Sequence, residues 1–126
     1  MFTEPPVMPK NFLRPCLLLL LREHQAHGYE LLERLRALGL SAHDPGGLYR
    51  ALRALERDGL VRSGWEPSQT GPERRIYQLT RAGMEELHAQ AKALVATRDA
   101  VDVFLSRYGE FVTLAPARAP ARSRRS

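Results

Sequence analysis

The chain has 126 residues, of which 44% are hydrophobic and 26% are charged. This length predicts a single folded unit with a modest core. Cys16 is the only cysteine, which excludes an internal disulfide and favours a reducing compartment. The N-terminal stretch lacks the order of a signal peptide, and the longest apolar run, CLLLLL at residues 16–21, is too short to cross a bilayer. We therefore expect a cytoplasmic protein with no membrane partner.

The formal net charge of +5 and the isoelectric point near 10.0 suggest an acidic partner such as nucleic acid. Four of the 19 basic residues, however, lie in residues 115–126, which leaves 15 basic against 14 acidic side chains in residues 1–114. The Pro/Ala/Arg composition of this end cannot bury a core, so we expect residues 113–126 to form a disordered basic tail. The stretch from Arg50 to Arg81 is more informative, because it holds seven arginines and four acidic residues.

Two helices are predicted after an N-terminal arm at residues 1–11. The first, in FLRPCLLLLLREHQA, has Pro15 in its first turn and runs to about Gln25. It is apolar nearly all round, so it must be covered on several sides. The second, YELLERLRAL at residues 29–38, has leucines at helical spacing and ends at Gly39.

A third helix is predicted to start among the turn formers Asp44, Pro45 and Gly46. On a helical wheel its apolar residues share one side, and the opposite side holds Arg50, Arg53 and Arg57, with Tyr49 beside them near the helix start. Such a face is either solvated, with acidic partners one helical turn away, or directed at a ligand. The three arginines have no acid at those spacings on their own side, which favours the second interpretation.

A β-hairpin follows the third helix. The helix ends at Gly59, Leu60, Val61 and Trp65 open one strand, and RRIYQLT supplies the other. The polar stretch EPSQTGPE between them forms a tip that leads to Arg74 and Arg75. Three helices and a hairpin with basic residues at its tip are the order of a winged helix-turn-helix domain, predicted at residues 12–80. In this fold the third helix enters the DNA major groove, where an arginine can bind guanine or phosphate through two hydrogen bonds.

A long fourth helix is predicted at residues 81–112, with Thr80 as its cap. Its apolar residues follow a three-four spacing that is typical of dimer-forming helices. The residues assigned to dimerisation are Leu87, Leu94, Val101, Phe104, Leu105 and Tyr108. Ala91 and Arg98 interrupt the pattern, so packing of the helix onto its own domain stays an alternative. The predicted fold class is therefore mainly α with a small β-hairpin: a winged helix-turn-helix domain followed by a C-terminal dimerisation helix.

Three stretches, HGYELLERL, GGLYRALRALERDGLV and GPERRIYQLTRAG, resemble in order and separation the signature of the PadR family of bacterial transcriptional regulators. With PKNFLRPCLLLLLRE included, the chain resembles the branch of poly-β-hydroxybutyrate-responsive repressors. The resemblance covers roughly residues 9 to 108. It implies a homodimeric repressor that responds to a small-molecule or polyhydroxybutyrate-related effector. It also implies that Tyr49 contacts a DNA phosphate and that Arg74 and Arg75 are the basic pair of the wing. The family usually has a small polar residue where this chain has Gly47, so specificity would depend more on Arg50 and Arg53.

Catalysis and metal binding are not supported by the sequence. Cys16 lies in an apolar run, where a thiol is more often a buried hydrophobe than a nucleophile. His24 and His27 could share a helix face, with His43 or His88 as further ligands, but no cysteine or carboxylate pattern accompanies them. We expect no enzyme activity, no cofactor and no metal. The predicted function is a sequence-specific DNA-binding repressor that binds inverted half-sites of double-stranded DNA as a homodimer. The alternative is a winged-helix adaptor that binds proteins and has no specific DNA binding.

Overall fold

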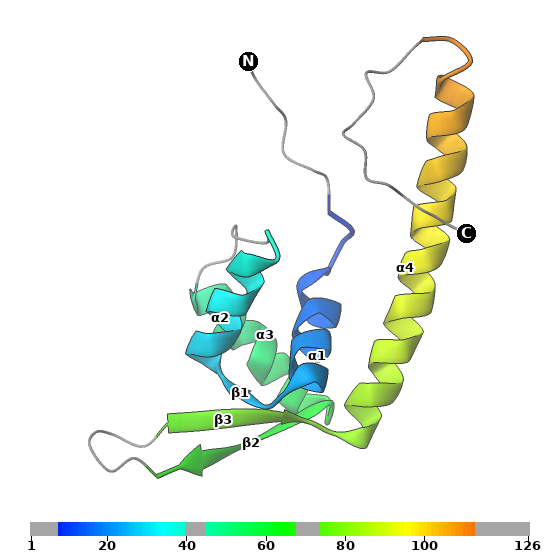
Figure 1. Cartoon of the computed structure of the whole chain (residues 1–126). Helices are drawn as coiled ribbons and strands as arrows, with labels where there is room; N and C mark the ends of the chain where they lie inside the picture. Colours follow the sequence, from blue (N-terminus) through cyan, green and yellow to red (C-terminus); the bar gives the residue numbers. More distant parts are fainter. Residues whose placement is uncertain (1–7, 40–44, 68–73, 113–126) are drawn as a thin grey trace, which may run out of the picture. The chain divides into compact units, whose positions relative to one another are not determined.

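The structure, a computed structural model, describes residues 8–39, 45–67 and 74–112. Its elements are α1 (Leu13–Glu23), β1 (Ala26–His27), α2 (Gly28–Ala37), α3 (Pro45–Arg57), β2 (Val61–Glu66), β3 (Arg74–Leu79) and α4 (Arg81–Tyr108) (Figure 1). The predicted fold class, a mainly helical winged-helix chain with a long C-terminal helix, is confirmed. Most of the predicted arm, Asp44, the hairpin tip at 68–73 and the predicted tail at 113–126 lie outside the described residues.

The core is built around α1. Its leucines 17, 18, 20 and 21 are almost completely buried, and they pack with leucines of α2 and α3 and with Val61 and Tyr77 of the sheet. The expectation that this helix is covered on several sides is correct, because α1 contacts α2, α3 and β3. Leu19 is the exception, with 45% of its surface exposed.

A third strand, β1, was missed by the sequence reading. Ala26 pairs with Tyr77 and His27 with Ile76, both antiparallel, so the sheet order is β1-β3-β2. Two residues are too few to show an alternating pattern, and only the neighbouring strand makes them a strand. The pairing places His27 directly before α2, where its main-chain N–H donates to the Glu30 carboxylate at 2.8 Å. This contact is half of a capping box that fixes the start of α2.

The register of the hairpin decides which side chains face the helices. Val61 pairs with Leu79, Ser63 with Tyr77, and Trp65 with Arg75. Paired residues share a face of the sheet, and successive residues alternate between faces. Val61 and Tyr77 are buried, so this face is the one turned to the core. The alternation of RRIYQLT is imperfect because the buried residue of this strand is Tyr77, whereas the aliphatic Ile76 lies on the opposite face of the sheet.

The start of α4 is held tightly against the turn that follows α3. The Thr80 hydroxyl accepts the Gly83 N–H at 3.0 Å and donates to the Gly59 carbonyl at 2.7 Å. A side chain at Gly83 would overlap the carbonyl oxygen of Leu60. Gly59 itself has a φ of 78°, which glycine adopts without strain. Thr80 is therefore the cap that the sequence predicts.

The chain divides into two compact units, Met1–Ala91 and Lys92–Ser126. The first three turns of α4 thus belong to the same compact unit as α1, α2, α3 and the sheet. Leu87 in these turns packs against the core. In the part of the chain that the structure describes, no helix is long and apolar enough to span a membrane.

Candidate nucleic-acid interface

One side of α3 is basic. Leu48, Leu52 and Leu55 are fully buried, whereas Arg50, Arg53 and Arg57 on the other side are exposed. Among the described residues, none of these three guanidinium groups has an ion pair or a hydrogen bond within the chain. The guanidinium groups of this face are therefore available to an external acceptor, and their planar donors match phosphate and carboxylate groups.

Tyr49 lies at the N-terminal end of this basic side. Its ring packs on the backbone of Gly28, the first residue of α2, so closely that a Cβ at residue 28 would overlap the ring. The side chain remains 37% exposed. A glycine at the start of α2 therefore allows the ring and hydroxyl of Tyr49 to lie directly against the helix end. Tyr49 is the residue for which the resemblance to the PadR family implies a phosphate contact.

Charged groups of α3 and the hairpin surround the buried Tyr77. Burial raises the pKa of the Tyr77 hydroxyl above its ordinary value. The negative charge of Glu56 and the neighbouring Tyr49 act in the same direction on this pKa, and Arg75 and Arg53 oppose them. Residues from α3 and β3 thus converge on one patch around Tyr77.

The two wing arginines lie on opposite faces of the hairpin. Arg74 and Arg75 are consecutive in β3, so one of them faces α3 and the other faces away. The Arg75 guanidinium lies 5.0 Å from the centre of the Trp65 ring, and its Nε donates to Ser63 Oγ at 3.0 Å. Arg74 is the register partner of Glu66. The predicted basic pair is thus split, because strand geometry turns neighbouring side chains apart.

Two consecutive hydrogen bonds connect the wing to α3. Ser63 on β2 accepts from Arg75 and donates to the Glu56 carboxylate on α3 at 2.8 Å. Trp65, the only tryptophan, is 61% exposed with Arg75 stacked on it. The residues predicted from the sequence to bind DNA do not include Ser63, Trp65 or Glu56. Alternation along the hairpin strands places Ser63 and Trp65 on the same face as Arg75. Only the tertiary fold brings Glu56 of α3 to Ser63.

The described part of the second unit carries an apolar stripe. Leu94, Val101 and Leu105 lie within about 40° of one another on a helical wheel, with Phe104 and Tyr108 beside them, and Val112 follows in the turn after the helix. The rings of Phe104 and Tyr108 are parallel, with centroids 6.2 Å apart. Except for Leu94, these residues are exposed at 39% or more. Leu87, assigned to the same seam, instead packs on the core of its own unit.

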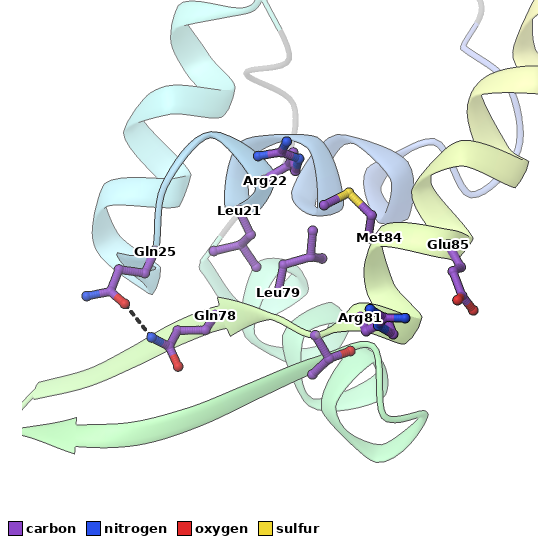
Figure 2. Close-up of a pocket in the computed structure, with 9 residues that line it drawn as sticks. Leu21, Arg22, Gln25, Gln78, Leu79, Arg81, Met84 and Glu85 are labelled. Carbon is purple, nitrogen blue, oxygen red and sulfur yellow. Dashed lines mark hydrogen bonds between the residues drawn. The ribbon is translucent and has the colours of Figure 1, made fainter.

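A pocket of about 560 Å³ opens beside the sheet in the first unit. Figure 2 shows Leu21 of α1, Leu79 of β3 and Met84 of α4 gathered in it, with Arg22, Arg81 and Glu85 around them. Gln25 and Gln78, also part of the lining, are hydrogen-bonded to each other. The pocket thus combines an apolar floor with charged and amide groups at its edge, which suits a small amphipathic molecule.

Comparison with known proteins identifies the fold and the family. The model of the transcriptional regulator PadR-like family matches residues 17–89, more than half of the chain. This chain belongs to the PadR-like family. Members of this family are DNA-binding transcriptional regulators with the winged-helix fold.

Solved PadR-type structures resemble this chain over most of its length. A PadR family transcriptional regulator from Eggerthella lenta is 30% identical, with 74% of this chain and 80% of that chain covered and a TM-score of 0.68. A PadR-like transcription factor from Bacteroides fragilis is 28% identical, with 75% and 91% covered and a TM-score of 0.66. A PadR-like regulator from Bacillus cereus is 26% identical, with 76% and 93% covered and a TM-score of 0.69. No curated protein matches the chain significantly.

Proposed function

We propose that this PadR-like protein is a repressor that binds an inverted-repeat operator as a homodimer and responds to a small-molecule effector. The observation that supports specific DNA binding most directly is the face of Arg50, Arg53 and Arg57 on α3, which has no partner among the described residues. It lies next to a hairpin whose Arg75 faces the same helix. A helix of this width fits the major groove, and an arginine fork can bind the O6 and N7 of guanine. Arg74 and Tyr49 are proposed to bind phosphates.

The test compares operator DNA with random DNA of equal length. Arg53→Ala is expected to weaken operator binding by about 1 to 3 kcal/mol and binding to random DNA far less, because a base contact is lost. Arg74→Ala is expected to weaken both equally and to reduce the salt slope by about one. The control is Arg36→Ala, which removes the same charge from the exposed last turn of α2. Electrophoretic mobility shifts measure the affinity of each variant, with the promoter region of the gene that encodes this protein as the operator DNA.

Two outcomes would contradict this assignment. Equal losses for Arg53→Ala on both DNAs would make Arg53 a phosphate contact. The absence of any shift by the unmodified protein would favour the alternative, a winged-helix adaptor that binds proteins. The adaptor interpretation does not account for the three arginines on α3, which have no partner among the described residues.

A small-molecule effector is proposed to control DNA binding. The pocket between the end of α1, β3 and the start of α4 offers an effector both apolar surface and charged groups. The resemblance to poly-β-hydroxybutyrate-responsive repressors suggests an effector related to that polymer. Such a ligand would have to bind the DNA-competent and DNA-free states with different affinity to act as a switch. Mass spectrometry of small molecules that purify with the protein would identify it.

A further inference from the structure

The guanidinium group of Arg75 is held by two contacts within the hairpin. Its Nε donates to Ser63 Oγ at 3.0 Å, and its Cζ lies 5.0 Å from the centre of the Trp65 ring. Trp65 is the register partner of Arg75, and Ser63 lies two residues before Trp65 on the same face of β2. Arg75 is exposed, and a free arginine side chain samples many rotamers. The two contacts restrict this freedom.

The hydroxyl of Ser63 is itself oriented by α3. Ser63 Oγ donates its proton to the Glu56 carboxylate at 2.8 Å, so its lone pairs are left to accept the Arg75 Nε–H. Both Ser63 and Glu56 are partly buried. Among the described residues, Glu56 forms no direct ion pair with Arg75. Glu56 therefore fixes the hydroxyl that holds Arg75, and no carboxylate occupies the guanidinium group.

The two outer nitrogens of this guanidinium group are available. Within residues 8–39, 45–67 and 74–112, the only hydrogen bond of Arg75 is the one from Nε, so Nη1 and Nη2 have no partner there. These nitrogens form a planar fork that matches the oxygens of a phosphate. Burial raises the pKa of the Tyr77 hydroxyl, and the positive charges of Arg75 and Arg53 both oppose that rise. The fork therefore lies close to the basic side of α3.

We propose that Ser63 and Trp65 are positioning residues that hold the Nη fork of Arg75 for a DNA phosphate beside α3. The proposal rests on the proposed DNA-binding function. Phosphates form the outer edge of the duplex, whereas base edges lie at the floor of a major groove about 8.5 Å deep. A guanidinium group that is held against its own hairpin meets the phosphates first. Because its geometry is set before DNA binds, Arg75 loses little rotamer freedom on binding.

The first experiment measures the contact between Arg75 and Trp65 in the full-length protein without DNA. Trp65 is the only tryptophan, so quenching of the protein's fluorescence by acrylamide reports how accessible its ring is. The guanidinium group covers one face of this ring, so Arg75→Ala should increase quenching. Ser63→Ala should also increase it, because Arg75 is released. Ser63→Thr keeps the hydroxyl and should restore the original quenching.

Arg62→Ala is the matched control for loss of an arginine from the hairpin. Arg62 lies on β2 but on the opposite face from Ser63 and Trp65, and its Nε donates to Gln78 at 3.2 Å. Its removal should leave the quenching of Trp65 unchanged. Urea unfolding of each variant shows whether the chain remains folded.

A double-mutant cycle then tests whether Ser63 affects DNA binding through Arg75. Arg75→Ala should weaken binding to operator and random DNA alike, by about tenfold, and reduce the salt slope by about one. Ser63→Ala alone should weaken binding by about three- to tenfold. It should have no further effect once Arg75 is alanine, because the two residues act as a unit. Ser63→Thr should bind as tightly as the unmodified protein.

Trp65 is tested by the same cycle. Trp65→Leu removes the aromatic face and should weaken DNA binding by about two- to fivefold, but only while Arg75 is present. Trp65→Phe keeps an aromatic ring under the guanidinium group and should retain most of the affinity.

Each result supports or overturns the proposal. An equal loss of affinity for Ser63→Ala with and without the Arg75 side chain would overturn it, as would unchanged quenching in Ser63→Ala. A loss for Arg75→Ala on operator DNA alone would replace the phosphate by a base contact. If the unmodified protein binds no DNA, the proposed function and the phosphate contact fail together. Quenching that follows the expected series would then still assign Ser63 the role of holding Arg75.

Discussion

Gly83 and Gly28 each lie so close to another group that a Cβ would not fit without a shift. The group beside Gly83 is main chain, whereas the group beside Gly28 is a side chain. A Cβ at Gly83 would overlap the Leu60 carbonyl oxygen, which the hydrogen bond from the Thr80 N–H holds in place at 3.1 Å. A Cβ at Gly28 would overlap the ring of Tyr49, a side chain that is partly exposed and can turn outward. The same substitution therefore has two different consequences.

We expect Gly83→Ala to lower the free energy of unfolding by about 1 to 3 kcal/mol, the usual cost of overpacking, because the backbone must shift. Gly28→Ala should change stability by less than about 1 kcal/mol, because Tyr49 can move and alanine favours the helix. It should instead weaken DNA binding, since Tyr49 leaves its place. Urea unfolding and mobility shifts measure both variants. Equal stability losses would show that Tyr49 cannot move.

At the scale of the element, α2 depends on an ionised carboxylate at its start. The hydrogen bond from the His27 N–H, aided by the His27 side chain and the charge of Arg34, holds the pKa of Glu30 below its ordinary value of 4.5. A lowered folded-state pKa means that the ionised form stabilises the fold. This contribution is complete above the ordinary pKa and is lost as the pH falls through the lower folded-state value.

Glu30→Gln should therefore lower the free energy of unfolding at neutral pH. Half of the Glu30 side chain is exposed, so solvent screening keeps the effect small. The difference between the two proteins should shrink as the pH falls below 4.5 and vanish once Glu30 is protonated in the folded state. Urea unfolding over this pH range measures it. A difference that stays constant with pH would show that the carboxylate charge does not contribute.

At the scale of the whole molecule, the proposed binding to an inverted repeat would need two copies of the α3 face. Part of the stripe assigned to dimerisation, from Val101 to Tyr108, is exposed in the single chain. Exposed apolar residues at helical spacing are typical of surfaces that a second helix covers. A dimer places two α3 helices on one face of the DNA and gains affinity from the linked second half-site.

Leu94→Glu places a charge in this stripe and should separate the protomers at micromolar concentration, because an unpaired carboxylate in an apolar interface costs several kcal/mol. Operator binding should fall with it. Ala96→Glu, on the opposite side of the helix, is the matched control and should stay dimeric. Size-exclusion chromatography with light scattering measures the mass of each protein. A monomeric unmodified protein, or a dimeric Leu94→Glu, would contradict the assignment of α4.

Local patterns were sufficient to predict much of this protein. An apolar run after Pro15 predicted the first helix, and apolar residues at helical spacing predicted the other three. Thr80 and the glycines marked helix ends, and the arginines of α3 were placed opposite its buried leucines. These features depend on residues within one or two turns of each other, so the sequence contains them directly. The PadR signature stretches added the family, which the family model confirms.

Only the tertiary structure decided the contacts between residues far apart in the chain. The strand β1, the split of Arg74 and Arg75 between two faces, and the packing of Leu87 on the core all follow from register and packing. The hydrogen bond between His27 and Glu66 spans 39 residues, and the two hydrogen bonds from Arg75 through Ser63 to Glu56 join three elements. No local pattern contains these pairs, because hydrophobic burial of α1 and the pairing of β3 bring them together only in the folded chain.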